Sequence, residues 1–281
     1  SGSRSLFRLK KWAGLITDDR DVENQVYQKF SSFFHIDSKR LLDYWLAYLK
    51  MPKETSNETE RLMLGMLYYS FYKKKPAQLG FKDLHEGIKD FLKEDFVKEE
   101  LMEVLRYRLS QLTVLPEANE YPFTCPLEVH CHYNVNQIMA AFDYFNQDQS
   151  PEFREGVKYF ADKKTDIFLI NLNKSEKDFS PSTMYEDYAI NAQLFHWQSQ
   201  SQDRPASPKI QRYIHQGETG NLISLFVREF KKQGNYTAAY TFLGNADYVS
   251  SAGERPVSFV WLLHQAIPAS LLAKANKAIA L

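Results

Sequence analysis

The residues with the clearest chemical potential lie in one stretch of the second half of the chain, residues 171–201. Its middle reads Tyr185, Glu186, Asp187 and Tyr188, and Trp197 follows among amide side chains. A pocket for an extruded nucleic-acid base needs this combination, because aromatic rings stack on the base and polar atoms bind its Watson–Crick edge. The same residue types also fit the core of a barrel with a polar rim, and the pattern alone leaves both interpretations open.

Small hydroxyl and basic side chains fill the loop that precedes this string. Such groups are the usual contacts to phosphate oxygens. We therefore predict that the DNA backbone is held by Lys174, Ser175, Lys177, Ser180, Ser182 and Arg212.

The charge of the chain limits how any nucleic acid is held. The 281 residues carry 35 basic and 35 acidic side chains, and residues 126–281 carry 15 and 16. Many nucleic-acid-binding domains are strongly basic. A DNA-binding surface on this protein must therefore be a local patch.

The sequence lacks the short motifs of common enzymes. It contains no phosphate-binding Gly-x-x-x-x-Gly-Lys loop, no Gly-x-Gly-x-x-Gly, no Gly-x-Ser-x-Gly and no His-x-Lys pair. We therefore expect a binding module without catalytic residues of its own.

One group of residues has the chemistry of a zinc site, namely Cys125, His130, Cys131 and His132. Thiolate and imidazole ligands suit zinc. Adjacent residues on a strand point to opposite faces, however, so one strand does not aim all four at one ion. We predict no metal site.

The elements that position these residues fall into two unlike halves. Residues 21–115 have helical periodicity, clearest where Leu41, Leu42, Trp45, Leu46 and Leu49 share one face. Pro-rich residues 117–126 form a loop between the halves.

The second half begins with one helix and continues as strands. Asn134 and Gln137 form the capping box of that helix. Apolar or alternating segments then predict strands at residues 166–172, 193–201, 222–230, 236–243 and 257–263. The fold class is therefore α+β, with a tag-removal scar at residues 1–3, an all-helical domain at 4–116, and a β-barrel or curved-sheet domain at 127–281.

The cysteine count and the lengths of the apolar runs indicate the cellular compartment of the protein. Two cysteines give no disulfide framework, and no apolar run reaches the ~18 residues of a membrane span. We expect a cytoplasmic protein with no membrane partner.

Residues 127–281 resemble an uncharacterised family found at the C-terminus of superfamily II helicase-like proteins, which often carry an N-terminal phospholipase D-type nuclease. The strings that carry the resemblance are LNKSEKDFSP (172–181), YEDYAI (185–190), LFHWQSQS (194–201), YTFLG (240–244) and GERP (253–256). The chain thus looks like the tail of an ATP-dependent type IV restriction enzyme specific for 5-methylcytosine.

A looser likeness links this tail to SRA (SET- and RING-associated) domains, which have a PUA-like barrel. Those domains carry Tyr-Glu-Asp-Asp and an aromatic residue twelve positions after that Tyr, as Trp197 follows Tyr185 here. The resemblance implies that Tyr185 and Trp197 sandwich a flipped base and that Asp187 accepts a hydrogen bond from the cytosine amino group. Tyr188 replaces the second Asp of the pattern, which leaves Glu186 as an alternative carboxylate.

The resemblance also implies the partners. They would be double-stranded DNA containing modified cytosine and the helicase and nuclease domains of the same parent chain. The fragment would need no cofactor, whereas the parent enzyme would use ATP and Mg²⁺. The near-neutral charge and the helical half favour an alternative, a protein-interaction domain that couples the motor to the nuclease without reading bases.

Overall fold

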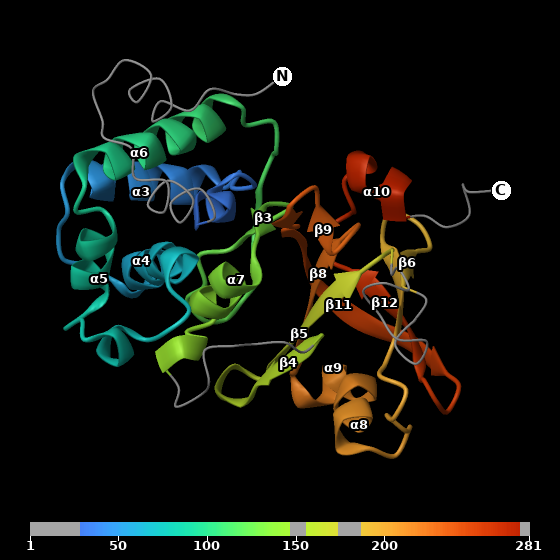
Figure 1. The fold of residues 1–281 in the computed structure, drawn as a ribbon. Helices are drawn as coiled ribbons and strands as arrows, with labels where there is room; N and C mark the ends of the chain where they lie inside the picture. The colour runs from blue at the N-terminus through green and yellow to red at the C-terminus, as the bar shows by residue number, and fades with distance from the viewer. Residues whose placement is uncertain (1–28, 147–155, 174–186, 276–281) are drawn as a thin grey trace. The chain divides into compact units, whose positions relative to one another are not determined.

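A computed structural model describes residues 29–146, 156–173 and 187–275 of the chain (Figure 1). These residues form two compact units. Of the described residues, the helical unit contains 29–114, 124–126 and 133–146, and the sheet unit contains 115–123, 127–132, 156–173 and 187–275. The protein is thus mixed in class, with helices towards the N-terminus and a mostly antiparallel sheet towards the C-terminus, as the sequence predicts.

Four helices of the first unit begin at a polar side chain that caps them. The Ser38 hydroxyl accepts the backbone N–H of Leu41 (3.2 Å), and Asn57 caps the next helix in the same way. The apolar face predicted from Leu41 to Leu49 is buried. The elements are η1 (Ser31–Phe33), α3 (Lys39–Lys50), α4 (Glu58–Phe71), η2 (Pro76–Leu79), α5 (Leu84–Phe91), α6 (Asp95–Ser110), α7 (Val135–Ala141) and η3 (Tyr144–Asn146).

Helix α7 belongs to the helical unit, which corrects the division at residues 116 and 127 that the sequence predicts. The capping box of Asn134 and Gln137 forms as expected. The Gln137 amide then donates to the hydroxyl of Ser70 (3.0 Å) and to the carbonyl of Ser32 (2.9 Å), and all of Gln137 is buried. These two hydrogen bonds attach α7 to the core of the helical unit.

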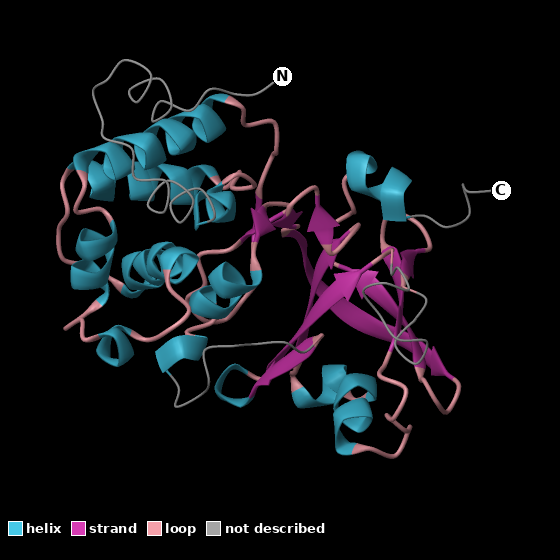
Figure 2. Cartoon of the chain, in the orientation of Figure 1, coloured by secondary structure: helices cyan, strands magenta, loops and turns pink. Residues whose placement is uncertain are grey.

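The strands of the sheet unit are drawn in magenta in Figure 2 and its helices in cyan. Its main sheet has the strand order β4-β5-β8-β11-β12-β7-β6, and β3 pairs with β11. The elements are β1 (Glu117–Ala118), β2 (Glu128–Val129), β3 (His132–Tyr133), β4 (Val157–Phe160), η4 (Ala161–Lys163), β5 (Thr165–Asn171), β6 (Tyr188–Ala189), β7 (Leu194–Gln198), α8 (Pro208–Ile214), α9 (Gln216–Thr219), β8 (Leu222–Arg228), β9 (Lys232–Gln233), β10 (Tyr236–Thr237), β11 (Tyr240–Ala252), β12 (Ser258–Leu263) and α10 (Ala269–Ala275).

Strand pairing places the aromatic core of this unit. Strands β5 and β8 are parallel, and the other pairs along the main path are antiparallel. On β7 and β12, Trp197 lies opposite Phe259 and Phe195 lies opposite Trp261, and all four are buried. Alternation along the two strands therefore builds one apolar face, which Tyr213 of α8 also covers.

None of the described helices is long and apolar enough to cross a bilayer.

Candidate nucleic-acid site on the sheet unit

The predicted base-pocket residues divide between the two faces of the sheet. Tyr188 of β6 pairs with His196 of β7, and their rings stack with centroids 4.7 Å apart. The next pair, Ala189 and Phe195, is fully buried on the opposite face, which is the face of Trp197. Tyr188 therefore does not share a pocket with Trp197, which corrects the prediction that groups them.

Asp187 does lie close to the strand that carries Trp197. It directly precedes β6, and its Oδ1 accepts the backbone N–H of Gln198 at 3.0 Å. The carboxyl-bearing residue is 8% exposed. A backbone hydrogen bond from the residue after Trp197 thus fixes Asp187 at the end of β7.

Trp197 is part of the core. Its ring stacks on Phe168 of β5 with centroids 4.2 Å apart and an interplanar angle of 25°, and it contacts Tyr213 and Phe259 at an angle. Only 6% of the residue is exposed. Phe168 therefore occupies one face of the indole, and a base could stack only on the other. The stacking role of Trp197 stays a prediction.

Arg212, which the sequence predicts as a phosphate contact, has a structural partner. Its guanidinium makes two hydrogen bonds of 2.8 Å to the carboxylate of Asp166, which is 1% exposed. The same group lies 3.8 Å from the ring centre of Tyr159, and the Asn221 amide donates to Asp166. A bidentate pair with a buried carboxylate gives Arg212 a structural role within the fold, and its role as a phosphate contact stays a prediction.

The family of the chain follows from comparison with known proteins. Residues 127–275 match a family described as "Domain of unknown function (DUF3427)". The chain belongs to this family. No curated protein matches it.

Among solved structures, the DUF3427 chain is similar to the crystal structure of Arabidopsis thaliana SUVH6 in complex with SAM. The two share 9% sequence identity with a TM-score of 0.33, and the match covers 90% of this chain and 41% of that chain. The chain thus spans less than half the length of that protein.

Two donors in the aromatic core of the DUF3427 region lack partners. The Tyr213 hydroxyl and the Trp261 indole N–H are buried and make no hydrogen bond with the described residues. The rings of Tyr213 and Trp197 lie 6.0 Å apart, and those of Tyr213 and Trp261 lie 6.3 Å apart. An unpaired buried polar group costs about 1–3 kcal/mol. Burial also raises the pKa of Tyr213 well above its usual value, so its hydroxyl stays a donor.

Tyr213 was not predicted as a site residue. No sequence motif marks this residue. The packing of α8 against β7 and β12 brings its ring close to that of Trp197.

Seven predicted residues lie outside the described part of the chain: Tyr185, Glu186, Lys174, Ser175, Lys177, Ser180 and Ser182. Their roles stay predictions.

The described residues contain no group of three or more side chains placed to hold a metal ion. Of the cysteine–histidine cluster singled out above, Cys125 and Cys131 are buried and form no disulfide. His132 is engaged through its Nε2, which lies 3.0 Å from the hydroxyl of Thr241.

Proposed function

We propose that the DUF3427 region is a DNA-binding module that recognises modified cytosine by flipping the base out of the duplex. The observation that carries the proposal is the hydrogen bond from Gln198 N–H to Asp187, which holds a carboxylate beside the strand of Trp197. A fixed carboxylate next to an indole provides an acceptor for the cytosine amino group and a ring for stacking. The SRA-like nature of the sheet belongs to this proposal.

Energetics set the expected selectivity. Stacking of a base on an aromatic ring contributes about 1–3 kcal/mol. A methyl group that enters a fitted apolar pocket adds about 1 kcal/mol. We therefore expect the module to prefer a methylated duplex by about fivefold, with most of the affinity coming from stacking and phosphate contacts.

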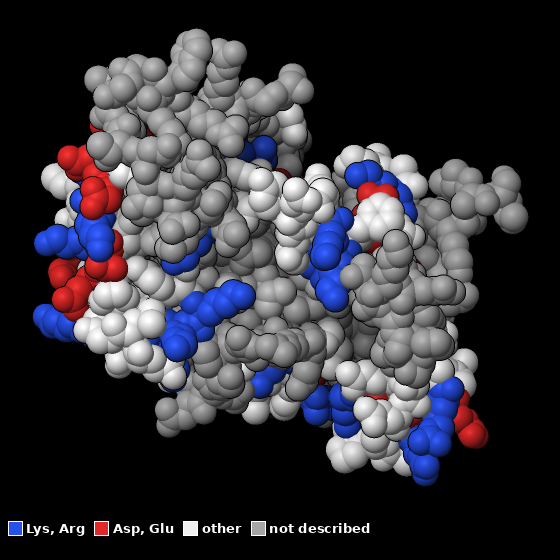
Figure 3. All heavy atoms as spheres, in the orientation of Figure 1, with Lys and Arg blue, Asp and Glu red and all other residues white. Residues whose placement is uncertain are grey.

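The electrostatic surface fits a local mode of binding. On the face drawn in Figure 3, the described Lys and Arg side chains of the sheet unit form separate small groups. The net charge of the chain is zero. Phosphate contacts should therefore come from a local patch, and the affinity should fall steeply with salt.

The wider setting is also part of the proposal. The module would deliver a modification-dependent restriction enzyme to its target, while ATP and Mg²⁺ serve the helicase and nuclease domains of the parent chain. The isolated chain would bind DNA without cleaving it and would act in the cytoplasm.

The test is fluorescence anisotropy with one duplex, prepared with and without a single 5-methylcytosine. The variant Asp187→Asn keeps an oxygen for Gln198 N–H but removes the negative charge. We expect it to weaken binding of the methylated duplex by about tenfold, because hydrogen bonds to charged groups contribute about 1.5–3 kcal/mol. The matched control is His196→Ala, on the opposite face, which should leave the preference unchanged.

Equal affinity for both duplexes, with no effect of Asp187→Asn, would refute base recognition. In that case the second candidate, a protein-interaction domain, becomes the better account. The observation in its favour is the set of exposed apolar side chains on the sheet unit, such as Phe230 (50% exposed), Tyr236 (47%) and Val249 (48%).

A further inference from the structure

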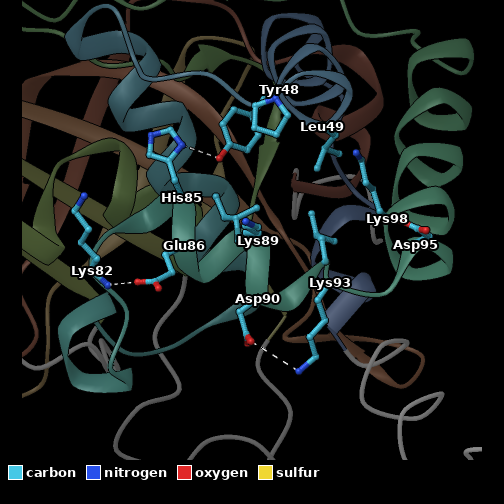
Figure 4. A pocket seen from close by; sticks show the side chains of 13 residues that line it. Tyr48, Leu49, Lys82, His85, Glu86, Lys89, Asp90, Lys93, Asp95 and Lys98 are labelled. Atoms are coloured by element: carbon cyan, nitrogen blue, oxygen red, sulfur yellow. Dashed lines mark hydrogen bonds and ion pairs between the residues drawn. The ribbon is translucent and has the colours of Figure 1, made fainter.

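The helical unit has a pocket of its own, about 840 Å³ in volume, between the end of α3, helix α5 and the start of α6 (Figure 4). Pockets of about 300–1,000 Å³ with mostly apolar walls are typical of small-molecule sites. The sequence gives no sign of this pocket, because one wall comes from α3, which ends at Lys50, and the others come from α5 and α6, which follow from Leu84 onward.

The floor of the pocket is apolar and its polar atoms are already paired. Leu49, Ile88 and Leu92 supply aliphatic side chains. The Tyr48 hydroxyl lies 2.8 Å from Nδ1 of His85. Burial, with nearby carboxylates, raises the pKa of Tyr48 to about 12, so the phenol stays protonated beside His85. A ligand would therefore meet the floor chiefly through apolar contact.

Carboxylates at the rim are mostly engaged within the fold. Glu86 accepts the backbone N–H of Lys82 at the start of α5. Asp90 accepts the hydroxyl of Tyr72 (3.3 Å) and pairs with Lys93 (3.8 Å). Lys93 thus compensates the charge of Asp90, whereas the charge of Glu86 remains.

Three of the lysine ammonium groups at the rim form no ion pair with the described residues. Lys82, Lys89 and Lys98 line the pocket and make no ion pair with any residue in the described part of the chain. In Figure 4 they come from both sides of the pocket and from its centre. Glu86 and Asp95 are the two acids of the lining that stand against these three lysines. The uncompensated charge around the apolar floor is therefore positive.

We propose that this pocket binds a small organic anion, with an apolar or aromatic body on the floor and an acidic group held by Lys89 and Lys98. The size of the pocket matches such a molecule better than a protein segment. The acidic group would gain two ammonium partners, and the body would be removed from water over Leu49 and Ile88.

The test uses the full chain and the dye 8-anilinonaphthalene-1-sulfonate, which combines an aromatic body with one sulfonate. We expect a saturable rise in fluorescence. The double variant Lys89→Glu/Lys98→Glu should weaken binding by about tenfold, since two attractive contacts become repulsive. The matched control is Lys73→Glu/Lys74→Glu, which makes the same charge change on exposed residues of the same unit outside the pocket. It should leave the affinity within about twofold.

Several outcomes would overturn the proposal. One is an equal loss in both double variants, because that would mean a general charge effect. Another is an unchanged affinity in Lys89→Glu/Lys98→Glu with an unchanged melting temperature. A third is saturable binding of an acidic peptide, such as a polyglutamate, without binding of the dye. None of these outcomes concerns methylated DNA, so this proposal and the proposed function fail independently.

Discussion

Arg212 gives the sharpest test of the reasoning, because the sequence and the structure assign it different roles. We consider the replacement Arg212→Met, which keeps much of the length of the side chain but removes both hydrogen bonds to Asp166. Asp166 is 1% exposed and would keep only the Asn221 amide as a side-chain donor. The variant therefore leaves a buried carboxylate with its charge uncompensated.

The loss in the free energy of unfolding depends on how deeply the Arg212–Asp166 pair is buried. Removing one partner of a buried ion pair costs about 3–5 kcal/mol. The side chain of Arg212 is 23% exposed, so water can replace part of the guanidinium. We therefore expect the lower end of that range, about 3 kcal/mol, in the free energy of unfolding measured with urea. Arg212→Lys keeps the charge but not the bidentate geometry and should lose less.

A matched control separates this pair from an ordinary surface pair. Lys39 and Asp43 on α3 are also bonded, but their side chains are 66% and 49% exposed. Lys39→Met should cost less than about 0.5 kcal/mol. A structural role for the Arg212–Asp166 pair is refuted if Arg212→Met lowers the free energy of unfolding by less than about 1 kcal/mol. It is equally refuted if the variant stays stable while the slope of log affinity for DNA against log salt falls by about one, which is the mark of a lost phosphate contact.

Three further predictions concern the sheet unit. Burial lowers the pKa of His264, but hydrogen bonds to Glu120 and Asp247 outweigh it and raise the pKa overall. A group whose pKa is raised by folding stabilises the folded state at pH values below its unfolded-state pKa, and this stabilisation is lost as the pH rises through the folded-state pKa. His264→Gln should therefore reduce the free energy of unfolding in urea more at about pH 6 than at about pH 9; an equal loss at both pH values would contradict this. Trp197→Ala should cost about 3–5 kcal/mol in unfolding free energy and Trp197→Phe clearly less, because the ring is packed in the core; a mild effect of the alanine would show that the indole is not a core residue. Tyr188→Ala should leave the preference for methylated DNA unchanged, because Tyr188 stacks on the face away from Trp197; loss of that preference in anisotropy would restore Tyr188 to the pocket.

Local patterns predicted much of the secondary structure. The spacing from Leu41 to Leu49 gave the buried face of α3, and the alternation around Trp197 gave the two faces of β7. Both features depend on residues close in sequence, whose geometry is set by helix and strand periodicity. Capping at Asn134 was predictable for the same reason.

Features that depend on long-range packing were not predictable. Arg212 and Asp166 are 46 residues apart, and nothing near either one indicates the other. Tyr188 was grouped with Trp197 through the Tyr-Glu-Asp-Tyr string, but its pairing with His196 places it on the face opposite Phe195. Helix α7 belongs to the helical unit through contacts such as the hydrogen bond from the Gln137 amide to the hydroxyl of Ser70, 67 residues away.

The interleaving of the two units has a consequence for how this protein could be divided or inherited. Residues 115–123 and 127–132 belong to the sheet unit, whereas 124–126 and 133–146 belong to the helical unit. A cut at residue 127, where the DUF3427 match begins, would separate β1 from β2 and would carry α7 away from α4. Neither unit would then keep its complete core. Gene fusions and fragments that respect only the family boundary should therefore give poorly folded products, and exchange between related proteins should move both units together.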